Sequence, residues 1–229
     1  RMTQLQYAQE YLGKFVNALR QFFPTEVILS AMSANPTSNL TPHISAGVSD
    51  NFLGVDVAGM GSDQTVLFSI ARLDKKRIAQ IDMQITEKTM LTDTIKRIKI
   101  QDLHYNYKKI YIDDGGIGFG VFSALLEDEQ TKRKVIAINN SARSIDKEDK
   151  KKKKILKEDL YNNLLVLMEQ GKVRLKDNPE IYQSLKSVQY EYDNGRFKIF
   201  GNYTHITEAL IRAAWCMKDK SLNIWIAYG

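Results

Sequence analysis

The sequence contains a single cysteine and only four prolines, and it lacks any long hydrophobic run. Cys216 has no partner for an internal disulfide or a zinc site, and its neighbours Trp215 and Met217 favour a buried helix position. A membrane-spanning helix needs about 20 apolar residues, and no stretch approaches that length. The N-terminus also lacks the order of basic, apolar and small residues that marks a signal peptide. We therefore expect a cytosolic protein that is not secreted.

Several catalytic motifs are missing as well. No G-x-x-x-x-G-K-[S/T] sequence occurs, which argues against a P-loop. The three histidines, His43, His104 and His205, form no convincing Ser-His arrangement, and none pairs convincingly with the lone cysteine. What is present is a chain of 229 residues with 43% hydrophobic residues and a formal net charge of +6. This length suits one large domain, and the charge favours a polyanionic partner modestly.

Hydrophobic periodicity predicts the order of the elements. Residues 1–32 read as helical with a restart after Phe23-Pro24, and the polar stretch 33–47 reads as a linker. The expected elements that follow are strands at 51–58, 65–73 and 77–86, a helix at 89–103, a strand at 108–114, a helix at 120–129, a strand at 134–139, a helix at 158–170 ending at Gly171, a hairpin around Asn194-Gly195 and a helix at 204–218. Short links between the first three strands indicate an antiparallel meander. The fold class is therefore α/β, with a mixed sheet and helices on its faces.

The stretch "IYIDDGGIGFG", residues 110–120, looks like a nucleotide-binding turn. Its glycines do not fit the G-x-G-x-x-G spacing, and two carboxylates at a strand end would repel a bare phosphate. A divalent cation reverses that argument, because hard cations bind carboxylate oxygens and bridge to phosphate. Asp113 and Asp114 therefore indicate a metal site that needs further acids. Nucleotide binding at the turn without metal is the alternative.

Two other acids are candidates for that site. Asp56 interrupts the apolar strand "FLGVDVA", where an unpaired carboxylate would be costly to bury; its alternative role is to cap the following glycine turn. Glu208 lies in "THITEALIRAAW", off the stripe formed by Ile206, Leu210, Ala213 and Met217 in the last helix. Its alternative role is structural, through the helix dipole and a pair with Arg212 at i+4.

Together these motifs resemble the ribonuclease H-like nuclease superfamily, and more narrowly the C-terminal nuclease domain of the viral terminase large subunit. "FLGVDVAGMGSDQTVL" and "IYIDDGGIGFGVFSALL" are similar to the first two acidic motifs of that family. "YNNLLVLMEQGKVRL", "IYQSLKSVQYEYDNGRFKIF" and "THITEALIRAAW" follow in the family's order. The resemblance implies a ribonuclease H-like fold with an added β-hairpin. It also implies a helical connecting segment and linker at 1–45, from a preceding ATPase, and a nuclease domain at 46–229.

Carried over by residue, the resemblance implies that Asp56 and Asp113 are the first two catalytic acids. Many family members carry an aspartate one or two residues after a histidine; Thr207 stands at one such position, and Glu208 is the nearest acid and our choice as the third. The implied ligands of one or two Mg²⁺ or Mn²⁺ ions are these three acids, with Asp63 and Asp114 in reserve. His205 matches the family histidine beside the third acid and is expected to orient that acid or a water, with Thr207 in support.

The implied substrate is concatemeric viral double-stranded DNA, cut during genome packaging in the cytoplasm of the infected host. Candidate DNA-binding residues are Lys150, Lys151, Lys152, Lys153 and Lys154, with Arg196 and Lys198 of the hairpin. An ordinary solvated loop explains the lysine run equally well. The resemblance also implies a packaging ATPase domain, a portal and a small terminase subunit as partners, and no membrane. We expect the sequence to be the isolated nuclease portion of such a protein.

Two other functions fit the same residues. A Holliday-junction resolvase or transposase-like nuclease would share the metal chemistry but cut a different substrate. A noncatalytic DNA-binding domain could keep the fold after losing its third acid, which Thr207 makes conceivable.

Overall fold

A computed structural model describes residues 20–33, 50–59, 63–138, 157–193 and 196–219. Its centre is a six-stranded sheet with the strand order β6-β5-β2-β3-β4-β7. These strands are β2 (Asp50–Asp56), β3 (Gln64–Arg72), β4 (Ile78–Glu87), β5 (Lys109–Ile112), β6 (Val135–Ala137) and β7 (Val173–Arg174). Strands β2, β3 and β4 form the antiparallel meander, and β5, β6 and β7 join it in parallel. The expected mixed sheet is confirmed.

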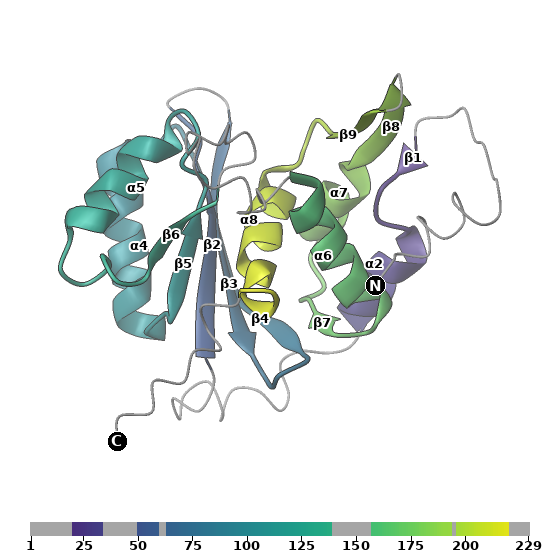
Figure 1. Cartoon of the computed structure of the whole chain (residues 1–229), viewed down its shortest axis with the longest axis horizontal. Helices are drawn as coiled ribbons and strands as arrows, with labels where there is room; N and C mark the ends of the chain where they lie inside the picture. Colours follow the sequence, from purple (N-terminus) through teal and green to yellow (C-terminus); the bar gives the residue numbers. More distant parts are fainter. Residues whose placement is uncertain (1–19, 34–49, 60–62, 139–156, 194–195, 220–229) are drawn as a thin grey trace, which may run out of the picture.

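Helices cover both faces of this sheet (Figure 1). One face carries α4 (Leu91–Tyr105) and α5 (Gly118–Glu127). The other carries α8 (His205–Ala214) directly on β2 and β3, with α6 (Lys157–Glu169) and α7 (Pro179–Ser187) packed against α8, and α2 (Thr25–Ser33) packed on α6 and α7. Because side chains alternate along a strand, Leu53 and Val55 pack with the α4–α5 layer, whereas Phe52 packs with the α8 layer. Asp56 follows Phe52 at even spacing and shares its face.

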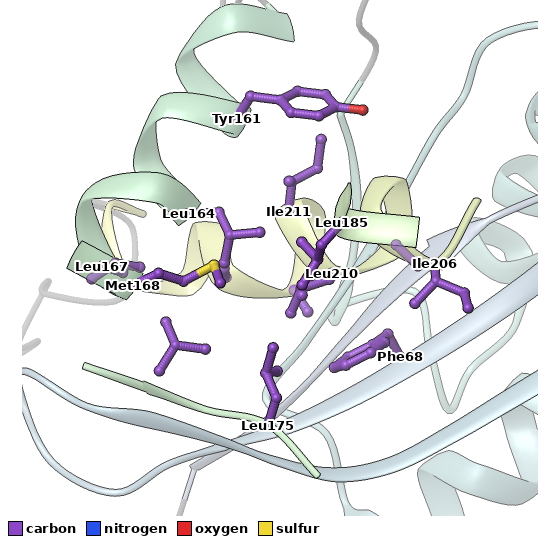
Figure 2. Close-up of a cluster of buried hydrophobic side chains, with 14 of the residues drawn as sticks. Phe68, Tyr161, Leu164, Leu167, Met168, Leu175, Leu185, Ile206, Leu210 and Ile211 are labelled. Carbon is purple, nitrogen blue, oxygen red and sulfur yellow. The ribbon is translucent and has the colours of Figure 1, made fainter. Parts of the chain in front are cut away.

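Among the described residues, the core beneath α8 is the larger of two apolar clusters. In Figure 2, Leu185 of α7 and Leu210 of α8 lie above Phe68 of β3, and Leu164 and Met168 of α6 continue the same cluster on the α6 side. Each of these side chains is almost fully buried, which stabilises the fold by roughly 1.5–3 kcal/mol per residue. Helix α8 is therefore fixed against the sheet by apolar contacts that are independent of its polar residues.

The second, smaller sheet has the order β1-β8-β9, with β1 (Arg20–Gln21), β8 (Gln189–Asp193) and β9 (Arg196–Phe200). The pairing of β8 with β9 confirms the predicted hairpin. The helix expected through residues 20–23 is wrong, because Arg20 and Gln21 pair with β8. The buried Phe22 and Phe23 then pack against Tyr161, which favours an extended approach to the core.

Local signals place several helix ends. Gly171 follows α6 with a φ of 64°, in the left-handed region that the expected C-cap requires. Asn178 caps α7 by accepting hydrogen bonds from the backbone N–H groups of Glu180 and Ile181, with Pro179 in the first turn. Cys216 is buried as expected, in the 3₁₀ turn η1 (Trp215–Met217) after α8. Within the described ranges, no helix combines the length and apolar character needed to cross a bilayer.

Candidate active site

Two of the predicted acids lie side by side because their strands do. Asp56 is the last residue of β2, and Asp113 directly follows β5. The two strands are parallel neighbours with Val55 opposite Ile112, so their carboxyl ends meet at the same edge of the sheet. That edge is where open α/β sheets bind their ligands.

Gly54 brings the third acid to this edge. A Cβ atom on Gly54 would lie 2.0 Å from the carbonyl oxygen of Ala209 and 2.5 Å from the amide nitrogen of Ala213. Only a glycine lets the backbone of α8 lie this close to β2. The close approach places the first turns of α8, with His205 and Glu208, beside Asp56.

Arg212 joins all three acids. Its Nη1 lies 3.4 Å from Asp56 Oδ1 and 3.1 Å from Glu208 Oε2, and its Nη2 donates to Asp113 Oδ2. Nη1 also donates to the backbone carbonyl of Glu208 at 2.7 Å. The Arg212 side chain is fully buried, so its charge acts in a site from which water is largely excluded. Acids from β2, from the turn after β5 and from α8 therefore surround one cation.

Further donors occupy the remaining carboxylate oxygens. Glu208 Oε1 accepts from the hydroxyl of Tyr161 at 2.7 Å and lies 3.0 Å from Lys157 Nζ. Asp113 Oδ1 accepts from the backbone N–H of Gly115 at 2.9 Å. Asp56 Oδ2 lies 2.9 Å from His205 Nδ1, which must carry the proton to donate to a carboxylate. Each of the six oxygens thus has a donor from the protein itself.

Burial and charge have opposite effects on the pKa values of this cluster. Burial raises the pKa of Asp56, against the hydrogen bond from His205 and the charge of Arg212. Burial also acts to raise the pKa of Glu208, but Arg212, Lys157 and the Tyr161 hydroxyl outweigh it and lower that pKa. The hydrogen bond to Asp56 raises the pKa of His205. Glu208 is therefore ionised at neutral pH although it is nearly buried.

The glycine turn after Asp113 is tightly built. Gly116 has a φ of 55°, and a Cβ on Gly118 would lie 1.8 Å from the backbone carbonyl oxygen of Asp113. Gly116 is favoured by its left-handed backbone conformation, and Gly118 is required because the backbone folds back onto Asp113 where α5 begins. The Oδ1 atom of Asp114 is buried and has no hydrogen-bond partner among the described residues. Asp114 thus lies beside the cluster without a contact to Arg212 of the kind that Asp113 makes.

The donor chemistry of the cluster fits a hard divalent ion, because its ligands would be carboxylate oxygens. The three carboxylates already face a common positive group, the guanidinium of Arg212. In this arrangement, however, all three carboxylates are engaged by that guanidinium. In the part of the chain that the structure describes, no three His, Cys, Asp or Glu side chains are arranged to hold one ion.

The other predicted site residues lie elsewhere. The hydroxyl of Thr207 is 2.9 Å from that of Ser184 in α7, which gives no support for a role beside the acids. Asp63 is exposed just before β3, and its charge contributes to the raised pKa of His205. Lys198 is exposed on β9, 4.0 Å from Glu191. The lysines at 150–154 and the side chain of Arg196 lie outside what the structure describes.

Sequence reasoning missed three participants. Arg212 was predicted only as the i+4 partner of Glu208; that pair is confirmed, but the contacts with Asp56 and Asp113 were not foreseen. Tyr161 and Lys157 come from α6, far from Glu208 in sequence, and no local sequence pattern predicts their contacts with Glu208. The predicted stripe of the last helix is confirmed, because Ile206, Leu210 and Ala213 are buried and Met217 packs against the same core. The burial of every other residue of α8 from Ile206 to Ala214 was not predicted.

The fold is similar to solved structures of large terminases. The nuclease of thermophilic phage G20c with bound magnesium matches with a TM-score of 0.58 and 19% identity, over 72% of this chain and 80% of that one. The nuclease domain of Thermus phage P74-26 matches with a TM-score of 0.56 and 18% identity, over 76% and 82% of the two chains. The large terminase of another thermophilic bacteriophage matches with a TM-score of 0.64 and 14% identity, over 94% of this chain and 49% of that one.

Further comparisons concern the metals bound by one of these nucleases and the similarity at the sequence level. The G20c nuclease is also known with bound cobalt and with bound zinc. No protein-family model matches the sequence, and no curated protein matches it. The similarity therefore lies in the strand order and the helical layers, because the sequence identity is low. This chain has the ribonuclease H-like fold of the large terminase nuclease domains.

Proposed function

We propose that the protein is a divalent-metal-dependent DNA endonuclease, the nuclease part of a viral terminase large subunit. The observation that carries this proposal is the convergence of Asp56, Asp113 and Glu208 at the carboxyl edge of a ribonuclease H-like sheet. Each acid comes from a different element, and each is fixed in position by backbone packing or a hydrogen bond. The fold it shares with phage terminase nucleases supports the same assignment.

In this proposal Asp56, Asp113 and Glu208 hold one or two Mg²⁺ or Mn²⁺ ions, with Asp63 and Asp114 as further candidates. Such an ion supplies an activated water and neutralises charge on the scissile phosphate. The protein's own part is to orient the ligands. His205 fixes Asp56 through the hydrogen bond at Oδ2, while Tyr161 and Lys157 fix Glu208.

The substrate we propose is concatemeric viral double-stranded DNA, cut during packaging in the cytoplasm of the infected host. The lysines at 150–154, with Arg196 and Lys198, are the proposed phosphate contacts. This chain spans about half the length of the third large terminase compared above. We therefore also propose an ATPase domain as a partner of the 46–229 nuclease domain through the 1–45 segment, together with a portal and a small subunit.

Plasmid cleavage tests this function. With Mn²⁺ we expect the protein to degrade supercoiled plasmid, with complete inhibition by EDTA. Asp56→Asn keeps the shape of the side chain and removes its charge, so we expect cleavage to fall by at least about 100-fold. Asp74→Asn is the matched control, because Asp74 lies in the exposed turn between β3 and β4, at the other end of the sheet from Asp56. Cleavage by Asp56→Asn at the control's rate would refute the assignment.

A noncatalytic DNA-binding domain is the second candidate, favoured by the occupation of all six carboxylate oxygens by protein donors. It predicts salt-dependent binding of plasmid without metal-dependent cleavage by any preparation. Cleavage that stops with EDTA and with Asp56→Asn would exclude it.

A further inference from the structure

The most unusual group in the acid cluster is Arg212. Its side chain is completely buried, yet its Nε has no hydrogen-bond partner among the described residues. Both of its terminal nitrogens instead point to acids, which lie on β2, after β5 and on α8. Packing of α8 does not require an arginine here, since that helix is held by apolar contacts with the sheet and with α6 and α7.

The requirement for a cation comes from the acids themselves. Three carboxylates within reach of one guanidinium repel one another, and burial makes each charge costly unless it is paired. Lys157 forms an ion pair with Glu208, and His205 donates a hydrogen bond to Asp56. Arg212 is the group that contacts all three acids, so it compensates the charge that the other two donors leave.

We propose that Arg212 is a built-in counter-ion of the acid site. It is a positioning residue that holds the three carboxylates together when no metal is bound, and it competes with a divalent ion for the same oxygens. This inference rests on the proposed function in one respect, namely that the acids bind such an ion. This role explains why the three acids lie together although no three described His, Cys, Asp or Glu side chains are arranged to hold a metal ion.

The competition has a consequence that can be measured. For a metal to bind, Asp113 Oδ2 or Glu208 Oε2 must leave the guanidinium, so the loss of a charge-assisted hydrogen bond reduces the net affinity for metal. Losing one such bond corresponds to about a tenfold change in a dissociation constant. Removing the guanidinium should therefore tighten metal binding by about tenfold and destabilise the metal-free protein.

The test uses Arg212→Gln, with Mn²⁺ as the probe and no DNA. Titration calorimetry gives the Mn²⁺ dissociation constant, and thermal melting is followed in EDTA and at rising Mn²⁺. We expect the variant to melt below the wild type in EDTA, to bind Mn²⁺ about tenfold more tightly, and to recover stability as Mn²⁺ rises. A purely structural role for Arg212 predicts the same deficit at every Mn²⁺ concentration.

Arg72→Gln is the matched control, because Arg72 pairs with Asp50 at the opposite end of β2 and β3. Its melting deficit should not depend on Mn²⁺. Should Arg212→Gln fail to fold, Arg212→Lys keeps the charge but loses the planar fork, and it should still bind Mn²⁺ more tightly than the wild type. Mn²⁺ affinity equal to or weaker than the wild type in the folded variants would overturn the inference.

The outcomes separate this inference from the proposed function. Tighter Mn²⁺ binding by the variant, with no plasmid cleavage by the wild type, would support the counter-ion and reject the nuclease. Metal-dependent cleavage by the wild type, with unchanged Mn²⁺ affinity in the variant, would support the nuclease and reject the counter-ion.

Discussion

Replacing Gly54 by alanine tests how the site is assembled. The added Cβ would lie 2.0 Å from the carbonyl oxygen of Ala209, about 1.5 Å short of the roughly 3.5 Å at which such atoms pack. Both partner atoms at 2.0 and 2.5 Å belong to the backbone of α8, so no side-chain rotation relieves the clash. The helix must move away from the sheet by about 1 Å or more. Overpacking of this kind costs about 1–3 kcal/mol, and we expect Gly54→Ala at or above the top of that range.

Urea unfolding measures this loss, with Gly120→Ala as the matched control. Gly120 lies inside α5, where its Cβ would make only an ordinary contact at 3.4 Å with Leu91 Cδ1. Alanine in a helix interior is favoured over glycine by up to about 1 kcal/mol, so the control should be neutral or stabilised.

Cleavage activity gives a second measurement on the same variant. Under conditions where Gly54→Ala remains folded, its plasmid cleavage should be reduced by about 100-fold. The reason is that a shift of α8 moves Glu208 and Arg212 away from Asp56 on β2. A Gly54→Ala protein as stable and as active as Gly120→Ala would refute the argument that close packing of α8 builds the site.

Two further predictions concern stability. Burial acts to raise the pKa of Asp50, but Lys108 and Arg72 outweigh it and lower that pKa, so its stabilising effect is present above the usual carboxyl pKa and is lost as pH falls through the lowered value. Asp50→Asn should therefore cost about 0.5–1 kcal/mol at pH 7, a modest loss because the group is partly exposed, and the difference from wild type should shrink in urea melts as the pH falls through the lowered pKa of Asp50; a constant difference would contradict this. Tyr161→Phe removes a buried donor to Glu208 and should cost about 1.5–3 kcal/mol in urea unfolding at pH 7, whereas unchanged stability would show that Lys157 compensates fully.

Local patterns predicted the elements that carry their own signal. The apolar run from Phe52 to Val55, the short links of the meander and the helix ending at Gly171 depend on residues close together in sequence. The short strand β7 and the pairing of β1 with β8 were not predicted, because two-residue strands carry no periodicity and are fixed only by their partners. Long-range packing of Phe22 and Phe23 overrode the helical pattern before Pro24.

The sequence by itself determined which acids are candidates and where they stand on their strands and helix. Asp56 interrupts an apolar strand, Asp113 ends another, and Glu208 precedes Arg212 by one helical turn. Only the tertiary structure decided that these acids meet, because the parallel pairing of β2 with β5 and the close approach of α8 over Gly54 join segments far apart in the chain. It also gave Arg212 its central position. Contacts set by backbone packing over such separations leave no periodic trace in the sequence.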